Sequence, residues 1–428
     1  MQTIQDHPLR YQLSNELHAR PFPTISALST VIYLAVKQPE EAVNRDRALD
    51  LAHLIDLLDR HGAPHPQPDA THYTAQIGRH WLKWEQHTEF VSYTLHCEGV
   101  ADRPFDPADF EVLPQDWLAA MPGQRVTSAM IRILPRGNLK QMKADAKSWF
   151  VPESTVMSQV LDDSITIGGD FRIDAAGHMR FAMFVSDSTG PQRIGRVVQR
   201  ICEIETYRAM SMLGFARARR LSSKITNLDG HLSRMMTQMT GDEVDPDQLL
   251  TQLLNISAEL ESMAAQSAFR FSATGAYEAL VNQRIGLLRE ERCAGYQTLA
   301  EFMLRRYEPA MRTVKSTETR LTVLADRARR AGELLRTRVD VQRSAQNQAL
   351  LESMDRRADL ALRLQHTVEG LSVVAISYYA VSLAAYALYP LAQLMDLSKG
   401  MLTALITLPV VALVWLSVRR LKKTLHNS

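Results

Sequence analysis

Three side chains near the N-terminus have the types and the spacing to do chemistry. Glu16, His18 and Arg20 lie within five positions, in the segment Asn-Glu-Leu-His-Ala-Arg-Pro-Phe that begins at Asn15. A carboxylate, an imidazole and a guanidinium so close together could act as acid and base or bind an anionic ligand. We favour a simpler interpretation, an ordered N-terminal arm held by salt bridges and by Phe22 in a pocket.

A second group of polar side chains lies in the segment Trp81–Phe90. If this segment is one extended strand, Glu85, His87 and Glu89 share a face, because side chains alternate along a strand. Two carboxylates and a histidine could then hold a divalent cation. The alternative, which we favour, is a hairpin turn near Gln86 with the charged groups in solvent.

A third pattern consists of polar and aromatic residues at helical spacing in an apolar segment. They recur at intervals of 7, 3, 4 and 3 residues and are Ser372, Tyr379, Ser382, Tyr386 and Tyr389. In a membrane helix such residues lie at helix–helix contacts or along a hydrated pathway. We expect a contact between subunits, with a pore lining as the alternative.

Familiar catalytic motifs are missing from the sequence. It contains no Gly-x-Ser-x-Gly, His-Glu-x-x-His or Gly-x-Gly-x-x-Gly. Its three cysteines, Cys97, Cys202 and Cys293, are too few and too scattered for a disulfide framework or a zinc site. A net charge of +2 gives no global field to attract nucleic acid. We therefore expect a non-enzymatic protein with no nucleic-acid partner and no cofactor beyond a divalent cation.

The first 188 residues are predicted to form a cytoplasmic mixed α/β domain around one sheet. Ala27–Val36 is rich in β-branched residues, which is typical of a buried strand, and Glu40–His61 carries apolar residues at helical spacing. Further strands are predicted at residues 73–85, 89–97, 125–134, 164–173 and 179–185, and helices at residues 107–120 and 139–150.

A helical stalk is predicted for residues 189–369, with breaks near residues 240–247 and at Pro309. After Pro309 the next proline is Pro390, and a continuous helix between them would be on the order of 120 Å long. Apolar residues recur there every three to four residues, falter over Gln342–Gln348 and then resume. This rhythm is typical of a coiled coil or a helix bundle.

Two apolar runs follow the stalk, at residues 370–395 and 401–418. Each is long enough, as a helix, to cross a bilayer core of roughly 30 Å. From Gly370 to Val418 only Asp396 and Lys399 are charged. The short link between the runs requires a tight turn, so we predict a two-helix transmembrane hairpin; a buried globular hairpin is the alternative. The expected fold class is α+β, with the mixed domain, the stalk and this hairpin in order.

Basic residues on both sides of the hairpin predict its orientation. They are Arg419, Arg420, Lys422 and Lys423 in the tail, residues 419–428, and Arg356, Arg357 and Arg363 before the first run. The positive-inside rule places both ends of the chain in the cytoplasm. The polar N-terminus lacks the apolar segment of a signal peptide. We expect a two-span protein of the bacterial inner membrane, with the lipid bilayer as a partner.

Several segments together resemble an uncharacterised family of bacterial membrane-anchored proteins, a domain of unknown function. The resemblance covers almost the whole chain and rests on Asn15–Pro23, Trp84–Phe90, Asp170–Arg172, Gly195–Gly214, Arg305–Arg306, Leu335–Asp340 and Thr367–Ser372. It implies membrane anchoring, with no established activity and no assigned site.

The expected architecture is also distantly similar to that of the CorA-type magnesium channels. These have an N-terminal α/β domain, a long helix that enters the membrane, a two-span hairpin and a basic tail. The likeness implies a pentamer whose first span lines the pore. Those channels carry Gly-Met-Asn just after the first span, whereas here Gly400-Met401 is followed by Leu402 at the start of the second. The filter motif of that family is therefore absent.

Three functional hypotheses remain. The leading one is a self-assembling membrane-anchored protein with a structural, scaffold or sensing role. The second is a CorA-like cation channel or transporter with the first span as its pore. The third is an enzyme that uses Glu16, His18 and Arg20.

Overall fold

The computed structural model describes residues 4–11, 13–14, 22–39, 45–239, 241, 245–393 and 398–425. It divides into two compact units. The first contains residues 1–244 and 251–332, and the second contains residues 245–250 and 333–428. The predicted acid, imidazole and guanidinium of the N-terminal segment, Glu16, His18 and Arg20, lie outside the described residues.

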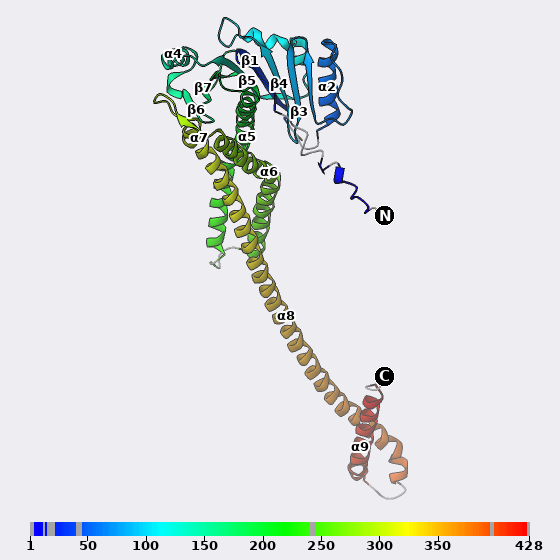
Figure 1. The fold of residues 1–428 in the computed structure, drawn as a ribbon. Coiled ribbons are helices and arrows are strands. Elements are labelled where there is room, and N and C mark those ends of the chain that lie inside the picture. The colour runs from blue at the N-terminus through cyan, green and yellow to red at the C-terminus, as the bar shows by residue number, and fades with distance from the viewer. Residues whose placement is uncertain are drawn as a thin grey trace. The chain divides into compact units, whose positions relative to one another are not determined.

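Nine strands form one mixed sheet in the first unit (Figure 1). They are β1 (Ser29–Lys37), β2 (His72–Ile77), β3 (His80–Gln86), β4 (Val91–Glu98), β5 (Gln124–Pro135), β6 (Val156–Val160), β7 (Ile165–Ile173), β8 (Met179–Val185) and β9 (Glu291–Arg292). Their order across the sheet is β2-β3-β4-β1-β5-β8-β7-β6-β9. The β5–β8 pair is parallel, and the other neighbours are antiparallel.

Short helices cover one face of this sheet. They are α2 (Arg47–Arg60), α3 (Gln115–Ala119) and α4 (Leu139–Trp149), with single turns η1 (Pro107–Val112) and η2 (Pro152–Ser154). Side-chain caps fix where the longer ones begin: Asp46 accepts a hydrogen bond from the Ala48 amide at 2.9 Å, and Asn138 accepts one from the Gln141 amide at 2.8 Å. Alternate residues of the strands pack on the apolar side of these helices to form the main core.

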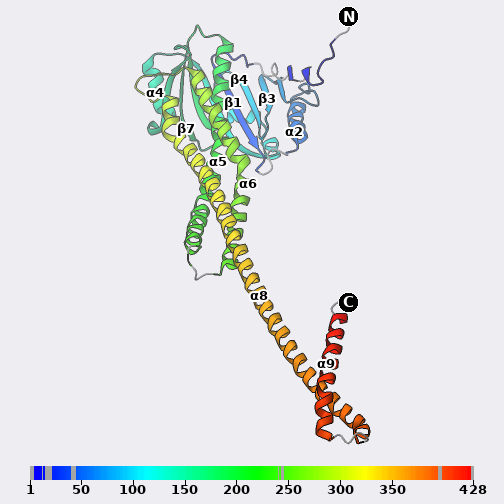
Figure 2. The same cartoon turned by 90° about the horizontal axis from the view of Figure 1, so that it is seen from below.

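The long helix α5 (Pro191–Gln238) lies on the opposite face of the sheet (Figure 2). Its first residue is a proline, which suits the first turn of a helix because no intrahelical N–H bond is lost there. Polar contacts link it to the strands: Tyr33 of β1 shares a 2.6 Å hydrogen bond with Thr206, and Thr127 of β5 donates one of 2.9 Å to Glu205. This face is therefore more polar than the α2 face.

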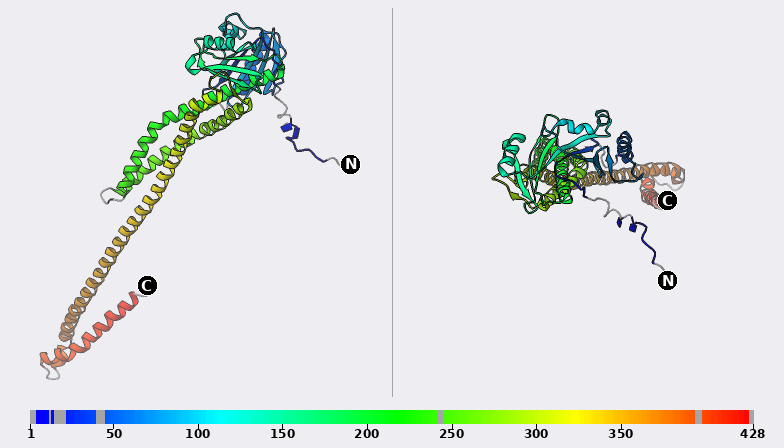
Figure 3. Two further views of the ribbon diagram at one scale, coloured as in Figure 1. Left: turned by 60° about the vertical axis from the view of Figure 1, so that its left-hand side comes forward. Right: turned by 45° about the horizontal axis from the view of Figure 1, so that its top comes forward.

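The helices α6 (Pro246–Leu288), α7 (Leu299–Arg306) and α8 (Glu308–Gln393) follow. In the first unit, α5, α6 and the start of α8 lie side by side (Figure 3, left). Ion pairs join them, between Lys315 and Glu278 at 2.8 Å and between Arg327 and Asp229 at 3.1 Å. The seam between these helices contains the buried side chains Leu221, Ile225, Leu228, Leu253, Ile256, Leu260, Leu321, Leu324 and Ala328.

The second unit consists mainly of the rest of α8 and of α9 (Lys399–Leu425). Most of its large apolar side chains are exposed, from Leu350 onward. Two helices of the described chain are long and apolar enough to cross a membrane, and they contain residues 370–391 of the first predicted run and the whole of the second. The Lys399 ammonium of α9 lies over the rings of Tyr386, at 5.3 Å, and Tyr389, at 6.0 Å, so α8 and α9 touch near their connection.

The predicted α+β class is confirmed, and the predicted helix between Pro309 and Pro390 is part of α8. The strand predicted at residues 73–85 is instead the hairpin β2–β3, because Gly78 adopts a positive φ of 56° and turns the chain. Strand β6 and a helix break at residues 289–298 are not predicted. A positive φ of 49° at Arg289, directly after the last residue of α6, ends that helix, and positive φ values at Ala294 and Gly295 keep the following segment non-helical.

Candidate functional site

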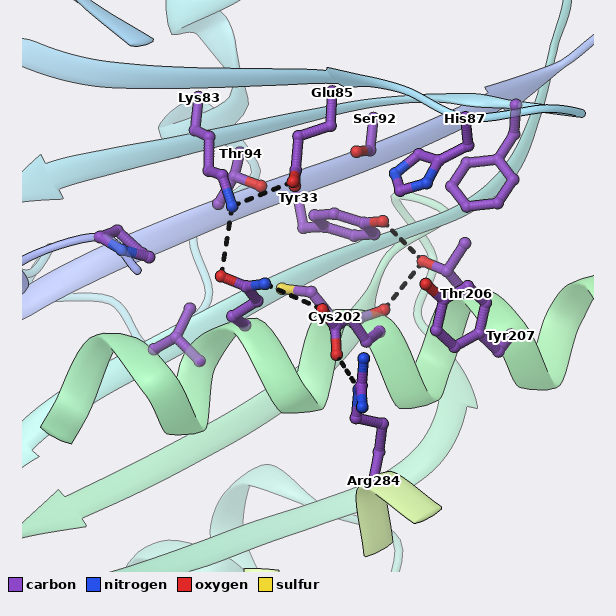
Figure 4. Close-up of a pocket in the computed structure, with 15 residues that line it drawn as sticks. Tyr33, Lys83, Glu85, His87, Ser92, Thr94, Cys202, Thr206, Tyr207 and Arg284 are labelled. Carbon is purple, nitrogen blue, oxygen red and sulfur yellow. Dashed lines mark hydrogen bonds and ion pairs between the residues drawn. The ribbon is translucent and has the colours of Figure 1, made fainter. Parts of the chain in front are cut away.

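A polar pocket of about 220 Å³ lies between the sheet and helices α5 and α6 (Figure 4). Its strand side carries Tyr33, Lys83, Glu85, Ser92 and Thr94, and its helix side carries Val198, Gln199, Cys202, Glu203, Thr206, Tyr207 and Arg284. Alternation along β3 explains the strand side. Leu82 and Trp84 point into the α2 core, so Lys83 and Glu85 point into the pocket.

A chain of polar contacts crosses the pocket from β3 to α6. The Lys83 ammonium lies 3.1 Å from Glu85 and donates to the Gln199 side-chain oxygen at 3.2 Å. The Gln199 amide donates to Glu203 at 2.9 Å, and Glu203 pairs with Arg284. We call these five residues the polar relay. Its two carboxylates and two cations balance in formal charge.

Two potentially nucleophilic groups of the pocket are held in their protonated forms. Burial raises the pKa of Tyr33 well above its ordinary value, and its hydroxyl is hydrogen-bonded to Thr206. Burial likewise raises the pKa of the Cys202 thiol. Burial raises the pKa of Cys97 to about 12 and raises that of Cys293 as well. A protonated thiol is a poor nucleophile, so none of the three cysteines is suited to covalent catalysis.

The segment Trp81–Phe90 is not one extended strand, so the alternative that we did not favour, with Glu85, His87 and Glu89 on one strand face, is wrong. Strand β3 ends at Gln86 and β4 begins at Val91, with these two residues paired. A turn between them closes with the His87 amide donating to the Phe90 carbonyl at 2.8 Å. The favoured hairpin is present.

The three predicted side chains of this hairpin have separate environments. Glu85 and His87 both line the pocket, and the His87 ring stacks on Phe90 with 4.2 Å between centroids. Glu89 is not in solvent, as the hairpin alternative expected, but only 1% exposed. It pairs with Arg270 and accepts a 2.9 Å hydrogen bond from Tyr277, both on α6. Glu89 therefore attaches the hairpin to α6.

A buried arginine fixes the start of the same turn. Arg45 donates to the His87 carbonyl at 2.7 Å and lies 3.2 Å from the Asp50 carboxylate. Within the described residues, no group of three or more His, Cys, Asp or Glu side chains is placed to hold a metal ion. Glu85, His87 and Glu89 are thus parts of a folded hairpin and its pocket rather than one ligand set.

The described end of the N-terminal segment reaches this pocket. Pro23 lines it, and the Ile25 amide donates to the Pro191 carbonyl at 3.2 Å. The Pro23 carbonyl lies so close to Gly195 that a Cβ added there would overlap the carbonyl oxygen. Gly195 therefore allows the segment before β1 to pack on the first turns of α5.

Most residues of the polar relay are not predicted from the sequence. Lys83 is the one whose position a strand pattern could have predicted. Trp81, Lys83 and Glu85 alternate with the core residues Leu82 and Trp84, so Lys83 shares a strand face with Glu85. Gln199 and Glu203 are one turn apart on α5, among apolar neighbours. Arg284 carries no local signal, because only the fold brings α6 to α5.

The pocket suits the binding of a small polar molecule. It is small compared with typical ligand pockets of about 300–1,000 Å³, and donors and acceptors of the relay line both sides. Its charged groups are engaged with one another, so a ligand would have to exchange contacts with them. This arrangement fits recognition better than proton transfer.

Fold and pocket define a class: an α+β protein with a polar pocket on one sheet face and two helices apolar enough to cross a membrane. The chain belongs to the family described as "Protein of unknown function (DUF3422)", which matches residues 5–425. The expected membership of an uncharacterised family is thereby confirmed. A comparison with curated proteins finds no match.

Proposed function

We propose that this chain is a non-enzymatic protein of the bacterial inner membrane that assembles with copies of itself through α8. Its role would be structural, scaffold-like or sensing, with the polar pocket as the ligand site. Both ends of the chain would be cytoplasmic, in keeping with the basic residues on both sides of the hairpin. The lipid bilayer would cover the apolar helices, and no nucleic-acid partner is proposed.

One observation carries the proposal: apolar side chains are exposed on α8 well before the membrane run begins. Leu350, Met354 and Leu364 are 61%, 59% and 66% exposed. A bilayer that covers residues 370–395 would not reach all of these residues. Exposed apolar rows of this kind mark a surface that another protein covers.

The spacing of these side chains fits a second copy of the same helix. They fall on one face with intervals of 4, 7, 3, 4 and 3 residues and are Leu350, Met354, Ala361, Leu364, Val368 and Leu371. Intervals of three, four and seven residues are those of a coiled-coil seam. Asn347 lies at a seam position as well, where a polar residue helps to set register and oligomeric state.

The test is the mass of the full-length protein extracted in mild detergent. We expect an oligomer that Leu364→Glu dissociates, because the change places a charge in the seam. Leu362→Glu is the matched control, since Leu362 is 56% exposed but lies away from the seam on the same helix. A monomeric wild-type particle, or equal dissociation by both changes, would reject self-assembly through this face.

The second candidate function is a CorA-like cation channel, which the aromatic stripe of α8 favours. Tyr379 and Tyr386 are 67% and 71% exposed, and Lys399 over the Tyr386 ring is an example of a cation held by an aromatic face. This candidate requires the first span to line a pore in an oligomer such as a pentamer. It predicts cation flux into liposomes that Tyr379→Ala or Tyr386→Ala alters. Flux no greater than that of empty liposomes would reject it.

A further inference from the structure

A second cavity, distinct from the polar pocket, lies where β1 ends and β5 begins, against α5 and α6. It is a groove of about 830 Å³. Its lining consists of Lys37, Gln38, Pro39, Gln124, Arg125, Val126, Ala209, Leu213, Ala216, Arg217, Arg219, Arg220, Gln266 and Arg270. We call it the basic groove, because six of these side chains are cationic and none of the described lining residues is acidic.

Most of these cations are not neutralised within the described part of the chain. Arg270 pairs with Glu89, and Arg217 donates only to neutral groups, Ser267 at 3.2 Å and Gln266 at 3.4 Å. Of the others, Arg220 has no ion pair with any described residue, whereas the Arg125 guanidinium packs against Gly177, outside the groove. Like charges gathered on one concave surface repel each other unless an anion joins them.

Lys37 shows that the crowding of positive charge extends to the base of the groove. Its side chain is buried, and its ammonium donates to the backbone carbonyls of Gln38, at 2.6 Å, and Pro39, at 3.4 Å. Burial lowers its pKa and the Arg270 charge lowers that pKa further, whereas the Glu89 charge raises it. Among the described residues the hydrogen-bond acceptors of its ammonium are carbonyls, so a further anion nearby would stabilise the charged form.

The rest of the lining is suited to more than a bare anion. Val126, Ala209, Leu213 and Ala216 provide an apolar floor, and Gln38, Gln124 and Gln266 provide amide donors and acceptors. Arginines bind phosphate oxygens with two parallel hydrogen bonds, apolar surface suits the face of a ring, and amides suit ring edges and hydroxyls. The volume falls within the usual range for sites of small organic ligands.

We propose that the basic groove binds a nucleoside di- or triphosphate, with its phosphates on the arginines of α5 and its base on the apolar side chains of the lining. The groove joins the last residue of β1 and the first of β5 to both long helices. Bound nucleotide would therefore link the ends of these two central strands to the helix pair α5 and α6. This site is independent of self-assembly through α8, so either proposal can fail alone.

The test is titration calorimetry of ATP into the full-length protein in detergent. We expect saturable binding that Arg220→Gln weakens about tenfold or more, because the change removes a charge-assisted contact. Arg234→Gln is the matched control. It removes the same charge from an exposed position of the same helix as Arg220, outside the groove, and should leave the affinity unchanged. Unchanged melting temperatures would show that each variant is folded.

Comparison of probes separates a nucleotide site from a general anion site. Inorganic tripolyphosphate should bind more weakly than ATP, because it leaves the apolar floor empty, and adenosine should bind more weakly still. Absence of ATP binding would overturn the proposal, as would equal weakening by Arg234→Gln or equal affinity for tripolyphosphate.

Discussion

The two compact units differ in how far they bury their large side chains. In the first, Trp84 and Trp117 are fully buried, and even the carboxylates of Glu89 and Asp170 are enclosed with partners. In the second, large apolar side chains from Leu350 onward face outward. The first unit buries large apolar side chains within the chain, whereas the second leaves many of them exposed.

Helix α8 contains both situations. Leu321, Leu324 and Ala328 repeat every three to four residues and are buried among α5 and α6, whereas Leu350 and Met354 continue a similar rhythm and are exposed. Periodicity thus predicts which face of a helix is apolar, but not what covers it.

Removal of the apolar helices should have the largest effect and tests the difference between the two units most directly. A chain that lacks residues 370–428 keeps the whole first unit, and we expect it to move completely from the membrane pellet to the soluble fraction. Removal of residues 419–428 alone should leave the protein in the pellet, because both runs remain. A truncated chain that still sediments with membranes would show that the first unit binds membranes itself.

The next largest effect should come from the core of the first unit. Trp117 is fully buried, stacks on His53 at 4.2 Å and donates to its carbonyl at 3.0 Å. Trp117→Ala should lower the free energy of unfolding by about 3–5 kcal/mol. Leu360→Ala, at a position 60% exposed, should change it by less than about 0.5 kcal/mol. Similar values from circular-dichroism melts of both variants would contradict the contrast between the units.

A smaller effect is expected where α5 and α6 approach most closely. A Cβ at Gly214 would overlap the Thr274 hydroxyl of α6, so Gly214→Ala should destabilise the first unit by about 1–3 kcal/mol. Gly230→Ala on the same helix meets only an arginine tip at 4.0 Å and should stabilise it by about 0.5–1 kcal/mol. Opposite signs in thermal melts are the expected result, and equal signs would argue against close packing of the helices.

A further predicted effect is a pH dependence that arises from the buried His53. Burial lowers the pKa of His53 to about 4, so the unfolded chain, with an ordinary histidine pKa near 6.5, takes up the proton first as pH falls. The corresponding stability is present above pH 6.5 and is lost as pH falls toward 4, by about 2 kcal/mol at pH 5. The nearby charges of Asp56 and Arg60 act on this pKa in opposite directions.

Thermal melts at pH 7 and pH 5 measure this effect. His53→Phe should reduce the difference in melting temperature between the two pH values. His231→Phe, at an exposed position of α5, is the control and should leave the difference unchanged. An unaltered difference in His53→Phe would show that this group does not contribute.

Local patterns in the sequence predict the elements well and their partners poorly. β-branched residues indicate β1, and the range predicted for β8 matches its observed bounds. The turn at Gly78 and the end of α6 before Arg289 depend on positive φ values, which hydrophobic periodicity does not report. The sheet order also joins segments far apart in the chain, such as β6 with β9, and no spacing rule encodes that pairing.

The candidate site is only half predictable for the same reason. Glu85 and His87 stand out as chemically versatile residues of one short segment, and both line the pocket. The other residues of the polar relay on the helix side of the pocket, Gln199, Glu203 and Arg284, come from two helices that are packed on the sheet. The spacing of Glu89 from Glu85 suggests that the two carboxylates lie on one strand face. Because of the tight turn, Glu89 instead contacts Arg270 and Tyr277 of α6.

The state of the three cysteines makes this chain convenient for mapping with thiol reagents. Because burial keeps the Cys97, Cys202 and Cys293 thiols protonated, maleimide should modify the native protein slowly at neutral pH. Neither apolar run contains a native cysteine. Single cysteines introduced along α8 and α9 can therefore be labelled with little reaction of the native thiols. The labelling rate at each position then distinguishes lipid-facing, protein-facing and water-facing residues.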